Sequence, residues 1–347
     1  MKGKGAQYNP SNPFLKQETS IVHKEGIDEF THEEKPQTQV FYESPKSVLS
    51  KNNSPDLKWS YSVNPYQGCE HGCVYCYARN SHTYWGFSAG LDFESKIIVK
   101  PNVAEQLERK LSESTWKVQP IMLSGNTDCY QPLEKKFGLT RKILEVMLKY
   151  QNPVSIITKN AMILKDLDIL KDLSSKSLVH VYLSITTLNE KLRTTLEPRT
   201  ASARKKLEAI EKLASAGIPV GIMNAPIIPG LNDHEIPEVL KQAANCGAQE
   251  AGYTVVRLNG QIAQIFEDWL VKSYPNKASK VMNQVKALHG GQANDSDWGK
   301  RLKGEGNYAL IIDQLFKKSK AQHFGDRKMP PYNLNIFRKG GNYNLFG

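Results

Sequence analysis

The chain has 347 residues, of which 39% are hydrophobic, and it carries a formal net charge of +11. This length and composition allow one large α/β domain with extensions, or two domains, with enough apolar residues for a core. No run approaches the roughly 18 apolar residues of a membrane span, and no apolar segment follows the basic N-terminus as in a signal peptide. We therefore expect no membrane association.

Charge and cysteine content indicate the compartment and the kind of partner. A positive net charge favours a polyanion, and DNA or RNA is the commonest candidate, although some cytosolic proteins are simply basic. The five cysteines are an odd number and three of them are clustered, which argues against a disulfide framework. We expect a reducing, cytoplasmic location.

The first 58 residues are polar, lack apolar periodicity and are interrupted by prolines. This pattern predicts a mostly irregular N-terminal arm over residues 1–58, either packed on the domain or mobile. Residues 59–65 then alternate between apolar and polar, which predicts a short strand that leads into a cysteine-rich loop.

That loop contains Cys69, Cys73 and Cys76, spaced C-x3-C-x2-C and accompanied by two glycines. Three thiolates on a tight loop can converge on a soft metal or an iron–sulfur cluster. The two other cysteines lie far downstream, so no fourth thiolate is in register and one coordination position stays open. The spacing therefore favours a reactive site over a structural one. A zinc knuckle that uses His71, or three incidental thiols, are the alternatives.

Residues 77–87 mix aromatic and basic side chains, including Arg79, His82, Tyr84 and Trp85. Such a mixture can stack on nucleic-acid bases. A loop that packs over the metal site and keeps water out explains the same residues equally well.

From residue 97 the chain alternates between short apolar runs and segments with helical periodicity. The predicted strands are residues 97–100, 120–124, 153–158, 178–185, 218–225 and 250–258. The predicted helices between them are residues 102–111, 140–150, 163–173, 201–216 and 233–246. Repeated strand–helix units imply a parallel sheet, and the missing G-x-G-x-x-G disfavours a dinucleotide fold. The fold class is α/β, and we expect an incomplete (β/α)6 TIM-type barrel at residues 59–260.

Polar residues follow nearly every predicted strand. The strand-end segments are 124–132, 158–160, 184–187, 197–199, 224–230 and 257–259. In such barrels the active site lies at the carboxyl ends of the strands. Any one of these segments is ordinary turn chemistry, but together they predict one polar mouth.

The cysteine spacing followed by an aromatic residue resembles the cluster loop of the radical S-adenosylmethionine (SAM) superfamily. The segments Asn126-Thr-Asp-Cys-Tyr-Gln-Pro-Leu-Glu, Thr158-Lys-Asn, Leu183-Ser-Ile-Thr-Thr, Leu196-Glu-Pro-Arg and Ala225-Pro-Ile-Ile-Pro-Gly-Leu-Asn-Asp resemble its spore photoproduct lyase-related (DNA repair photolyase-like) branch. The resemblance spans about residues 60–320. It implies a partial barrel, a [4Fe–4S] cluster and SAM as cofactors, and an electron donor such as flavodoxin or ferredoxin.

The resemblance also implies roles for individual residues. Cys69, Cys73 and Cys76 would ligate three irons, and SAM would chelate the fourth. The residues that would contact SAM are Tyr75 (backbone, adenine), Ser124, Gly125 and Asn126 (amino group), Lys159 and Ser184 (carboxylate and ribose), and Asn224 and Ala225 (adenine side). A lysine suits a carboxylate, and a serine hydroxyl suits a ribose. Glu197 and Arg199 would form a buried ion pair, which can equally be only structural.

One departure concerns the reaction itself. In the lyase that repairs spore photoproduct, a cysteine at the end of the second strand returns a hydrogen atom, whereas Ser124 or Gly125 stands at the matching place here. Cys129 is a substitute candidate as catalytic residue, and a small buried core residue is the favoured alternative. The implied chemistry is reductive cleavage of SAM to a 5′-deoxyadenosyl radical, which abstracts a hydrogen atom from the substrate.

After residue 260 the barrel pattern ends. Apolar faces predict helices at residues 261–271, 278–288 and 308–318, which form a helical C-terminal extension over residues 261–320. A basic, flexible tail is expected at 321–347. Its end, with Leu345 and Phe346, resembles the short peptide by which bacterial DNA enzymes dock on the sliding clamp, although its first positions differ. A tail packed on its own domain is the alternative.

Three functions follow from these patterns. The first is a radical SAM enzyme that acts on nucleic acid in DNA repair or modification. The second is a radical SAM enzyme with a protein or small-molecule substrate. The third is a non-catalytic zinc or iron–sulfur protein that binds nucleic acid.

Overall fold

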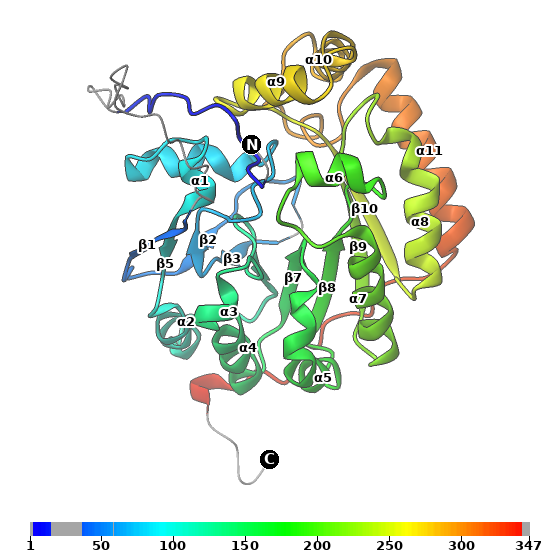
Figure 1. Cartoon of the computed structure of the whole chain (residues 1–347). Coiled ribbons are helices and arrows are strands. Elements are labelled where there is room, and N and C mark those ends of the chain that lie inside the picture. The colour runs from blue at the N-terminus through cyan, green and yellow to red at the C-terminus, as the bar shows by residue number, and fades with distance from the viewer. Residues whose placement is uncertain (1–2, 15–36, 58, 342–347) are drawn as a thin grey trace.

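A computed structural model describes residues 3–14, 37–57 and 59–341. Its main sheet has seven strands in the order β10-β9-β8-β7-β6-β3-β2. Their bounds are β2 (Leu49–Lys51), β3 (Tyr61–Val63), β6 (Ile121–Leu123), β7 (Val154–Thr158), β8 (Val179–Ser184), β9 (Val220–Ile227) and β10 (Glu250–Val255). The pairings from β3 to β10 are parallel, and only β2 pairs antiparallel to its neighbour. The carboxyl ends of six strands therefore meet at one edge (Figure 1).

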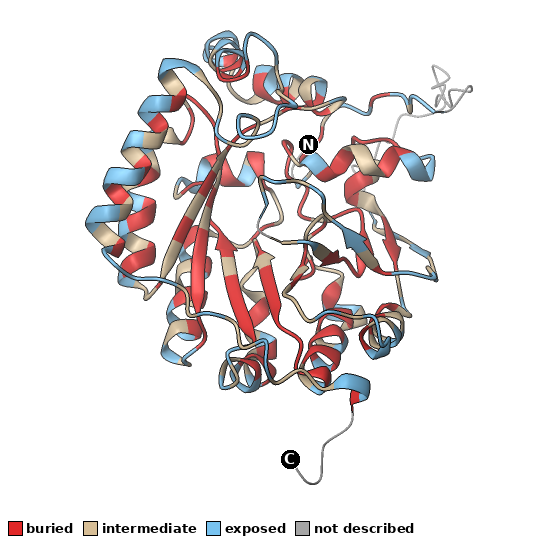
Figure 2. Cartoon of the chain, turned by 180° about the vertical axis from the view of Figure 1, so that it is seen from behind, coloured by how far each residue is buried: buried red, intermediate tan, exposed pale blue. Residues whose placement is uncertain are grey.

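Helices between the strands cover the outside of this sheet (Figure 1). They are α2 (Val103–Ser112), α4 (Leu139–Tyr150), α5 (Leu167–Ser174), α7 (Ala203–Ser215) and α8 (Ile236–Asn245). Each buries one apolar stripe; on α4, for example, Ile143, Leu144 and Met147 are fully buried. Figure 2 shows buried residues along the strands and exposed ones on the outer helix faces. The predicted α/β alternation is confirmed.

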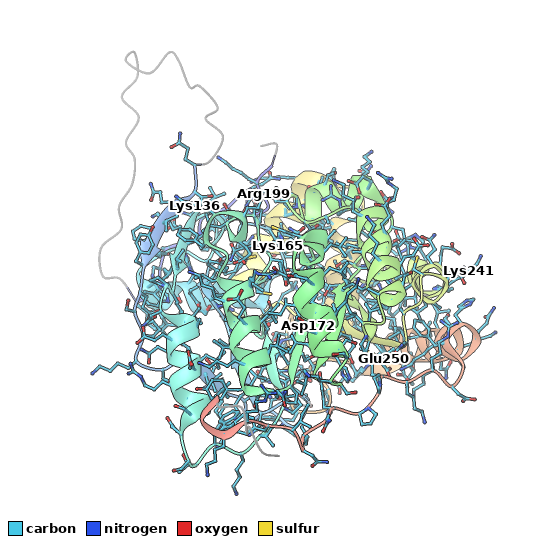
Figure 3. The ribbon with its side chains drawn as sticks, turned by 90° about the horizontal axis from the view of Figure 1, so that it is seen from below. Lys136, Lys165, Asp172, Arg199, Lys241 and Glu250 are labelled. Atoms are coloured by element: carbon cyan, nitrogen blue, oxygen red, sulfur yellow. The ribbon has the colours of Figure 1, made fainter. Side chains whose placement is uncertain are left out.

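Several short elements connect these units. They are η1 (Tyr77–Trp85), α1 (Asp92–Ser95), α3 (Glu134–Phe137), η2 (Ala161–Asp166), α6 (Glu190–Leu196) and η3 (Asp233–Glu235). The segment 77–87, which was expected as a loop, is mostly the 3-10 helix η1. Side chains crowd the space between the strands and the surrounding helices (Figure 3).

The predicted strand at residues 97–100 exists but lies outside the main sheet. It is β5 (Lys96–Val99), which pairs with β1 (Gln39–Tyr42) and β4 (Tyr66–Gln67) in a separate three-stranded sheet. Because β5 is not part of the main sheet, β3 is the first parallel strand of that sheet along the chain. An apolar run identifies a strand but does not identify its partner, which is why sequence alone misplaced it.

The described part of the N-terminal arm is more ordered than its composition predicts. It contributes β1 and β2, one strand to each sheet. Residues 3–14 lie against η1 and α1, where Asn12 donates to the carbonyls of Thr83 (2.9 Å) and Phe87 (3.1 Å). The arm is thus strand at residues 39–42 and 49–51, and its extent as a unit stays a prediction.

The C-terminal extension consists of α9 (Ile262–Ser273), α10 (Ala278–Ala287) and α11 (Gly306–Phe324). Helix α11 packs beside α8 and runs past the predicted boundary at residue 320 (Figure 1).

The described part of the tail follows α11. Tyr332 stacks on His180 with ring centroids 3.9 Å apart. Arg338 N–H donates to the Tyr150 carbonyl at 2.8 Å, just before η4 (Lys339–Gly341). This part of the tail packs on the domain. Leu345 and Phe346 lie outside the described residues, and the proposed domain boundaries stay predictions.

Within the described ranges, no helix has the length and apolar character that crossing a membrane demands.

Candidate active site

The cysteine loop follows β4 and is shaped by its two glycines. Gly68 and Gly72 have φ angles of +82° and +69°, which side-chain-bearing residues rarely adopt. Cys69 N–H donates to the Phe93 carbonyl at 2.9 Å, which ties the loop to α1. Cys69 and Cys73 are buried, and Cys76 is half-buried at the start of η1.

The three cysteine side chains satisfy the donor requirements of an iron–sulfur cluster. Burial and the neighbouring Cys69 sulfur raise the pKa of the Cys76 thiol to about 11, so these two sulfurs lie within electrostatic reach of each other. Cys69, Cys76 and Ala78 also share one apolar cluster with Phe93. Among the described residues, no three His, Cys, Asp or Glu side chains converge as one metal ion would require. Thiolates are the ligand type that iron–sulfur clusters take.

His71 is not free to act as a metal ligand. Its Nδ1 lies 3.3 Å from Asp128 Oδ2, and its Nε2 lies 3.3 Å from Asn160 Nδ2. Burial lowers the pKa of His71, but the Asp128 carboxylate and the Cys69 sulfur outweigh this and raise the pKa to about 10. Asp128 also accepts from Lys159 N–H at 2.7 Å. The histidine therefore joins the loop to the ends of β6 and β7, which disfavours the zinc-knuckle alternative.

A buried arginine–glutamate pair contacts the backbone of the cysteine loop. Arg79 is fully buried, donates to the Cys73 carbonyl at 2.9 Å and pairs with Glu94 at 2.8 Å. Glu94 also accepts from Gly5 N–H (3.0 Å) and Ala6 N–H (2.7 Å) of the N-terminal arm. The cysteine loop, α1 and the arm are therefore held by one carboxylate, a role that the sequence did not reveal.

Arg199 also contacts this carboxylate, at 2.7 Å. The predicted ion pair between Glu197 and Arg199 is therefore wrong. The two residues are separated by a proline, and their side chains reach different partners, Arg199 toward Glu94 and Glu197 into the mouth.

Glu197 follows α6 and is the centre of a second buried network. It accepts from Thr186 Oγ1 at 2.6 Å and from the Tyr75 hydroxyl, and it pairs with Lys159 at 3.4 Å and Lys206 at 3.6 Å. Burial alone would raise the pKa of Glu197, but the two lysines, then Thr186 and Tyr75, lower it to about 2. Glu197 is therefore ionised at neutral pH.

Two lysines, Lys159 and Lys206, face the Glu197 carboxylate in this network. Burial lowers the pKa of Lys159, but the Glu197 carboxylate outweighs this and raises it, so the ammonium stays protonated. Lys159 Nζ also contacts the Ala225 carbonyl at 3.3 Å and lies 5.8 Å from the centre of the Tyr75 ring. Two lysines against one carboxylate fit one further carboxylate, which is the group expected of SAM.

The ends of β8 and β9 carry the other predicted SAM contacts. Ser184 is buried at the last position of β8. Asn224 Nδ2 donates to the Ile185 carbonyl at 2.8 Å, while its Oδ1 is buried and has no partner within the described structure. The Ala225 carbonyl already accepts from Thr186 Oγ1 at 2.8 Å. The free oxygen of Asn224 suits a donor such as the adenine amino group.

The segment after β6 forms the opposite wall. Ser124 has a φ of +75°, and its Oγ accepts from Cys129 N–H at 2.7 Å. A Cβ on Gly125 would stand 2.6 Å from Ser62 Cβ, so only glycine fits there. Asn126 and Gly125 line a polar cavity of about 280 Å³, together with Trp59 and Ser62. The Tyr77 hydroxyl donates to the Gly125 carbonyl at 2.7 Å, which joins this wall to η1.

Cys129 lies in the main hydrophobic core and is fully buried. Its carbonyl accepts from Thr140 Oγ1 at 2.7 Å. Burial raises the pKa of its thiol well above the ordinary value, so it is a neutral core thiol in this environment. This placement favours the core interpretation of Cys129 over a catalytic one.

Loop and strand ends are thus brought together at one mouth, with Thr186 as a connecting residue that the sequence analysis did not single out. Its sequence signals are its place in the strand-end segment 184–187 and in the segment Leu183-Ser-Ile-Thr-Thr, without a role of its own. Because strand ends carry threonines for many reasons, these signals are weak.

Comparison with known proteins shows the family of the chain. The Radical SAM superfamily model matches residues 63–243. The chain is 32% identical over 238 residues to the uncharacterized protein Rv2578c of Mycobacterium tuberculosis, covering 68% of this chain and 70% of that protein. It is 31% identical over 241 residues to the uncharacterized protein MJ0683 of Methanocaldococcus jannaschii, covering 69% of this chain and 85% of that protein.

Among solved structures, spore photoproduct lyase complexed with dinucleoside spore photoproduct shares the fold. The similarity covers 82% of this chain and 80% of that one, with a TM-score of 0.60 and 17% sequence identity. The chain belongs to the radical SAM superfamily. It is therefore a radical SAM enzyme, and its cofactors are a [4Fe–4S] cluster and SAM.

Proposed function

We propose that this enzyme reductively cleaves SAM and abstracts a hydrogen atom from a nucleic-acid substrate, in DNA repair or modification. The observation that carries the proposal is the joining of the cysteine loop to four strand ends. His71 links it through Asp128 to β6 and β7, and Tyr75 links it through Glu197 and Thr186 to β8 and β9. The mouth is thereby organised around the cysteines, as expected of an incomplete (β/α)6 barrel.

The cofactor contacts follow from the same geometry. Cys69, Cys73 and Cys76 would hold three irons, and the ammonium of Lys159 would hold the SAM carboxylate. Asn224 Oδ1 would accept from the adenine amino group, beside Ala225 and the Tyr75 backbone. Ser184 would contact the ribose, and the 124–126 segment the amino group. Together, the bound cluster and SAM supply the reducing equivalent and the hydrogen-abstracting group, while the protein orients them.

Three features favour nucleic acid as the substrate. The net charge is +11. The structural relative is complexed with a dinucleoside photoproduct. Helix η1, which starts at the cluster loop, exposes 52% of Tyr77, 78% of Tyr84 and 40% of Trp85, as a base-stacking surface would. A protein or small-molecule substrate is the second candidate. Family membership leaves the non-catalytic alternative without support.

No cysteine stands at the end of β6 to return a hydrogen atom to the substrate. Cys129 is in the core, and Ser124 and Gly125 occupy the end of β6. We therefore propose the general radical SAM chemistry and do not extend it to the cysteine-dependent repair of spore photoproduct. The sliding-clamp contact through Leu345 and Phe346, and a flavodoxin or ferredoxin as reductant, stay proposals as well.

Anaerobic reconstitution tests the proposed function. Wild-type protein should bind about four irons per chain and release 5′-deoxyadenosine from SAM when dithionite is added. Damaged or modified DNA or RNA should bind and suppress the cleavage that occurs without substrate. Bound zinc without SAM cleavage would overturn the cofactor assignment, and cleavage that no nucleic acid affects would overturn the substrate.

A further inference from the structure

Buried side-chain atoms without hydrogen-bond partners gather after the last strand of the sheet. Thirteen such atoms occur among the described residues. Four of them belong to two adjoining segments at the carboxyl end of β10: Arg257 Nε, Asn259 Oδ1, Gln261 Oε1 and Asn294 Oδ1. We call these four residues the β10-end cluster. Because an unpaired buried polar atom destabilises the fold, such a concentration marks a place where a ligand or water supplies the partners.

The cluster is next to the cysteine loop. Leu258 N–H donates to the Ala293 carbonyl at 3.0 Å, which brings the two segments together. Asn80 Nδ2 donates to the Asn259 carbonyl at 2.9 Å. Asn80 lies in η1, the helix that begins directly after Cys76. A ligand at the β10-end cluster would therefore stand beside the cofactor mouth.

Arg257 brings a positive charge to this place without a direct ion pair among the described residues. The neighbouring Arg301 is compensated, because Asp56 lies 2.6 Å from its Nε. Burial, and next the charge of Arg301, lower the pKa of Arg257, against smaller opposite contributions from Tyr77, Asp56 and Asp295. An anionic group that contacts the guanidinium directly would stabilise its charge.

Aromatic residues lie near Arg257 and its neighbour Arg301. Tyr77 contributes to the electrostatic surroundings of Arg257, and this residue is 52% exposed while its hydroxyl donates to the Gly125 carbonyl. Trp298 is also 52% exposed, and the Arg301 guanidinium lies 4.8 Å from the centre of its ring. Such rings offer flat faces on which a base can stack.

We propose that the β10-end cluster binds one nucleotide of the substrate. The Arg257 guanidinium donates to a phosphate, and the free amide oxygens of Asn259, Gln261 and Asn294 accept from base or sugar donors. A peptide carboxylate could pair with the arginine, but the exposed rings and three acceptors match a planar heterocycle with N–H donors better. The inference rests on the proposed function and names the contact through which that site selects its substrate.

The test measures binding to the reconstituted holoenzyme. A fluorescently labelled single-stranded DNA of mixed sequence is titrated by anisotropy against wild type, Arg257→Gln and Arg257→Lys. Arg257→Gln should weaken binding about tenfold and lower the slope of log affinity against log salt by about one. Arg257→Lys should recover part of the loss, because lysine keeps the charge without the guanidinium fork. Arg204→Gln is the matched control, since Arg204 is 79% exposed on α7 and pairs only with Glu208; it should change affinity less than twofold.

A second variant keeps the inference testable if Arg257→Gln does not fold. Asn294→Asp adds a negative charge to the β10-end cluster, which repels the DNA backbone, and should weaken DNA binding at least as much as Arg257→Gln, while iron content stays at the wild-type value. Equal DNA affinity of Arg257→Gln and Arg204→Gln would overturn the inference and leave the proposed function standing. If wild type binds no oligonucleotide but binds an acidic peptide through Arg257, both the inference and the nucleic-acid substrate fail.

Discussion

The two sides of the mouth differ in how far their polar groups are satisfied. On the cofactor side, Glu197 alone gathers two lysines, a threonine and a tyrosine, and Asp128 gathers His71 and a backbone N–H. At the β10-end cluster, four buried side-chain atoms lack partners. A fully paired network fixes side chains in advance, whereas unpaired groups wait for a ligand. The difference separates the paired networks of Glu197 and Asp128 from the β10-end cluster, which we propose the substrate completes; on the cofactor side, Asn224 Oδ1 is the unpaired atom assigned to SAM.

The largest expected effect comes from removing a cluster ligand. Cys73→Ala should abolish 5′-deoxyadenosine release and lower the iron content, because two thiolates cannot hold the cluster. Iron analysis and chromatography of the products measure both. Cys246→Ala, which changes a half-buried thiol at the end of α8, should keep iron and activity. Full activity of Cys73→Ala would contradict the cluster assignment.

Removing the charge of Glu197 should break the paired network. Glu197→Gln leaves Lys159 and Lys206 buried without their carboxylate, so the free energy of unfolding should fall by about 3–5 kcal/mol. Urea denaturation of the apoprotein at pH 7 measures this. Glu190→Gln, a 54% exposed partner of Arg193, should cost less than about 1 kcal/mol.

The same carboxylate predicts a pH dependence. Its pKa is about 2 in the folded protein and 4.5 as the unperturbed value, so the folded state binds fewer protons between these limits. Its stabilisation is complete above pH 4.5 and is lost as the pH falls toward 2, in total about 3 kcal/mol. Glu197→Gln should lack this component of the acid transition. An identical acid profile in the variant would show that Glu197 is not ionised by its lysines.

A smaller effect is expected from a substitution at Gly125, directly after Ser124 at the end of β6. Gly125→Ala places a Cβ 2.6 Å from Ser62 Cβ and 3.3 Å from the Trp59 ring. The unfolding free energy should fall by about 1–3 kcal/mol, because the wall must move. The double variant Gly125→Ala/Ser62→Gly should regain part of the loss in the same denaturation experiment. No rescue would mean that the strain lies elsewhere.

The smallest effect concerns Lys303, which contacts β10 over the Tyr253 ring at 3.3 Å. Burial lowers the pKa of Lys303 to about 8. The Asp313 carboxylate opposes this shift, and the charges of Lys317 and Lys320 add to it. The unfolded chain therefore binds more protons between pH 8 and 10.5, and stability should rise with pH in that window. Screening of this partly exposed group limits the rise to about 1 kcal/mol or less. Lys303→Met should lack it when unfolding is measured at several pH values.

The fold was largely predictable because apolar periodicity is a property of each segment. Strands β6 to β9 and helices α4 and α7 stand where buried residues repeat at the required spacing. The pairing of β5 with β1 and β4 was not predictable, because its apolar run carries no record of its neighbours. The strands β1 and β2 in the polar arm were missed for the related reason that their residues are mostly exposed.

The site was predictable in its residue types and less so in its pairings. The spacing of the cysteines and the polar strand ends indicated the mouth, and Lys159 and Asn224 lie in it. The sequence could not show that Glu197 turns to Lys159 while Arg199 turns to Glu94, since two residues of separation fix no direction outside a helix or strand. Arg257 and Asn259 of the β10-end cluster belong to the predicted strand-end segment 257–259, but the sequence could not show that their polar atoms lack partners, because a missing partner can only be seen in three dimensions.

Isotope transfer tests the central claim most directly. Reconstituted enzyme, SAM and dithionite are incubated with deuterated DNA or RNA, intact or carrying base lesions or modifications, and 5′-deoxyadenosine is analysed by mass spectrometry. The account predicts deuterium in the 5′-deoxyadenosine with wild type and a marked loss of it with Arg257→Gln. Release of 5′-deoxyadenosine that never carries deuterium from any nucleic acid, together with transfer from a deuterated peptide or small molecule, would contradict it.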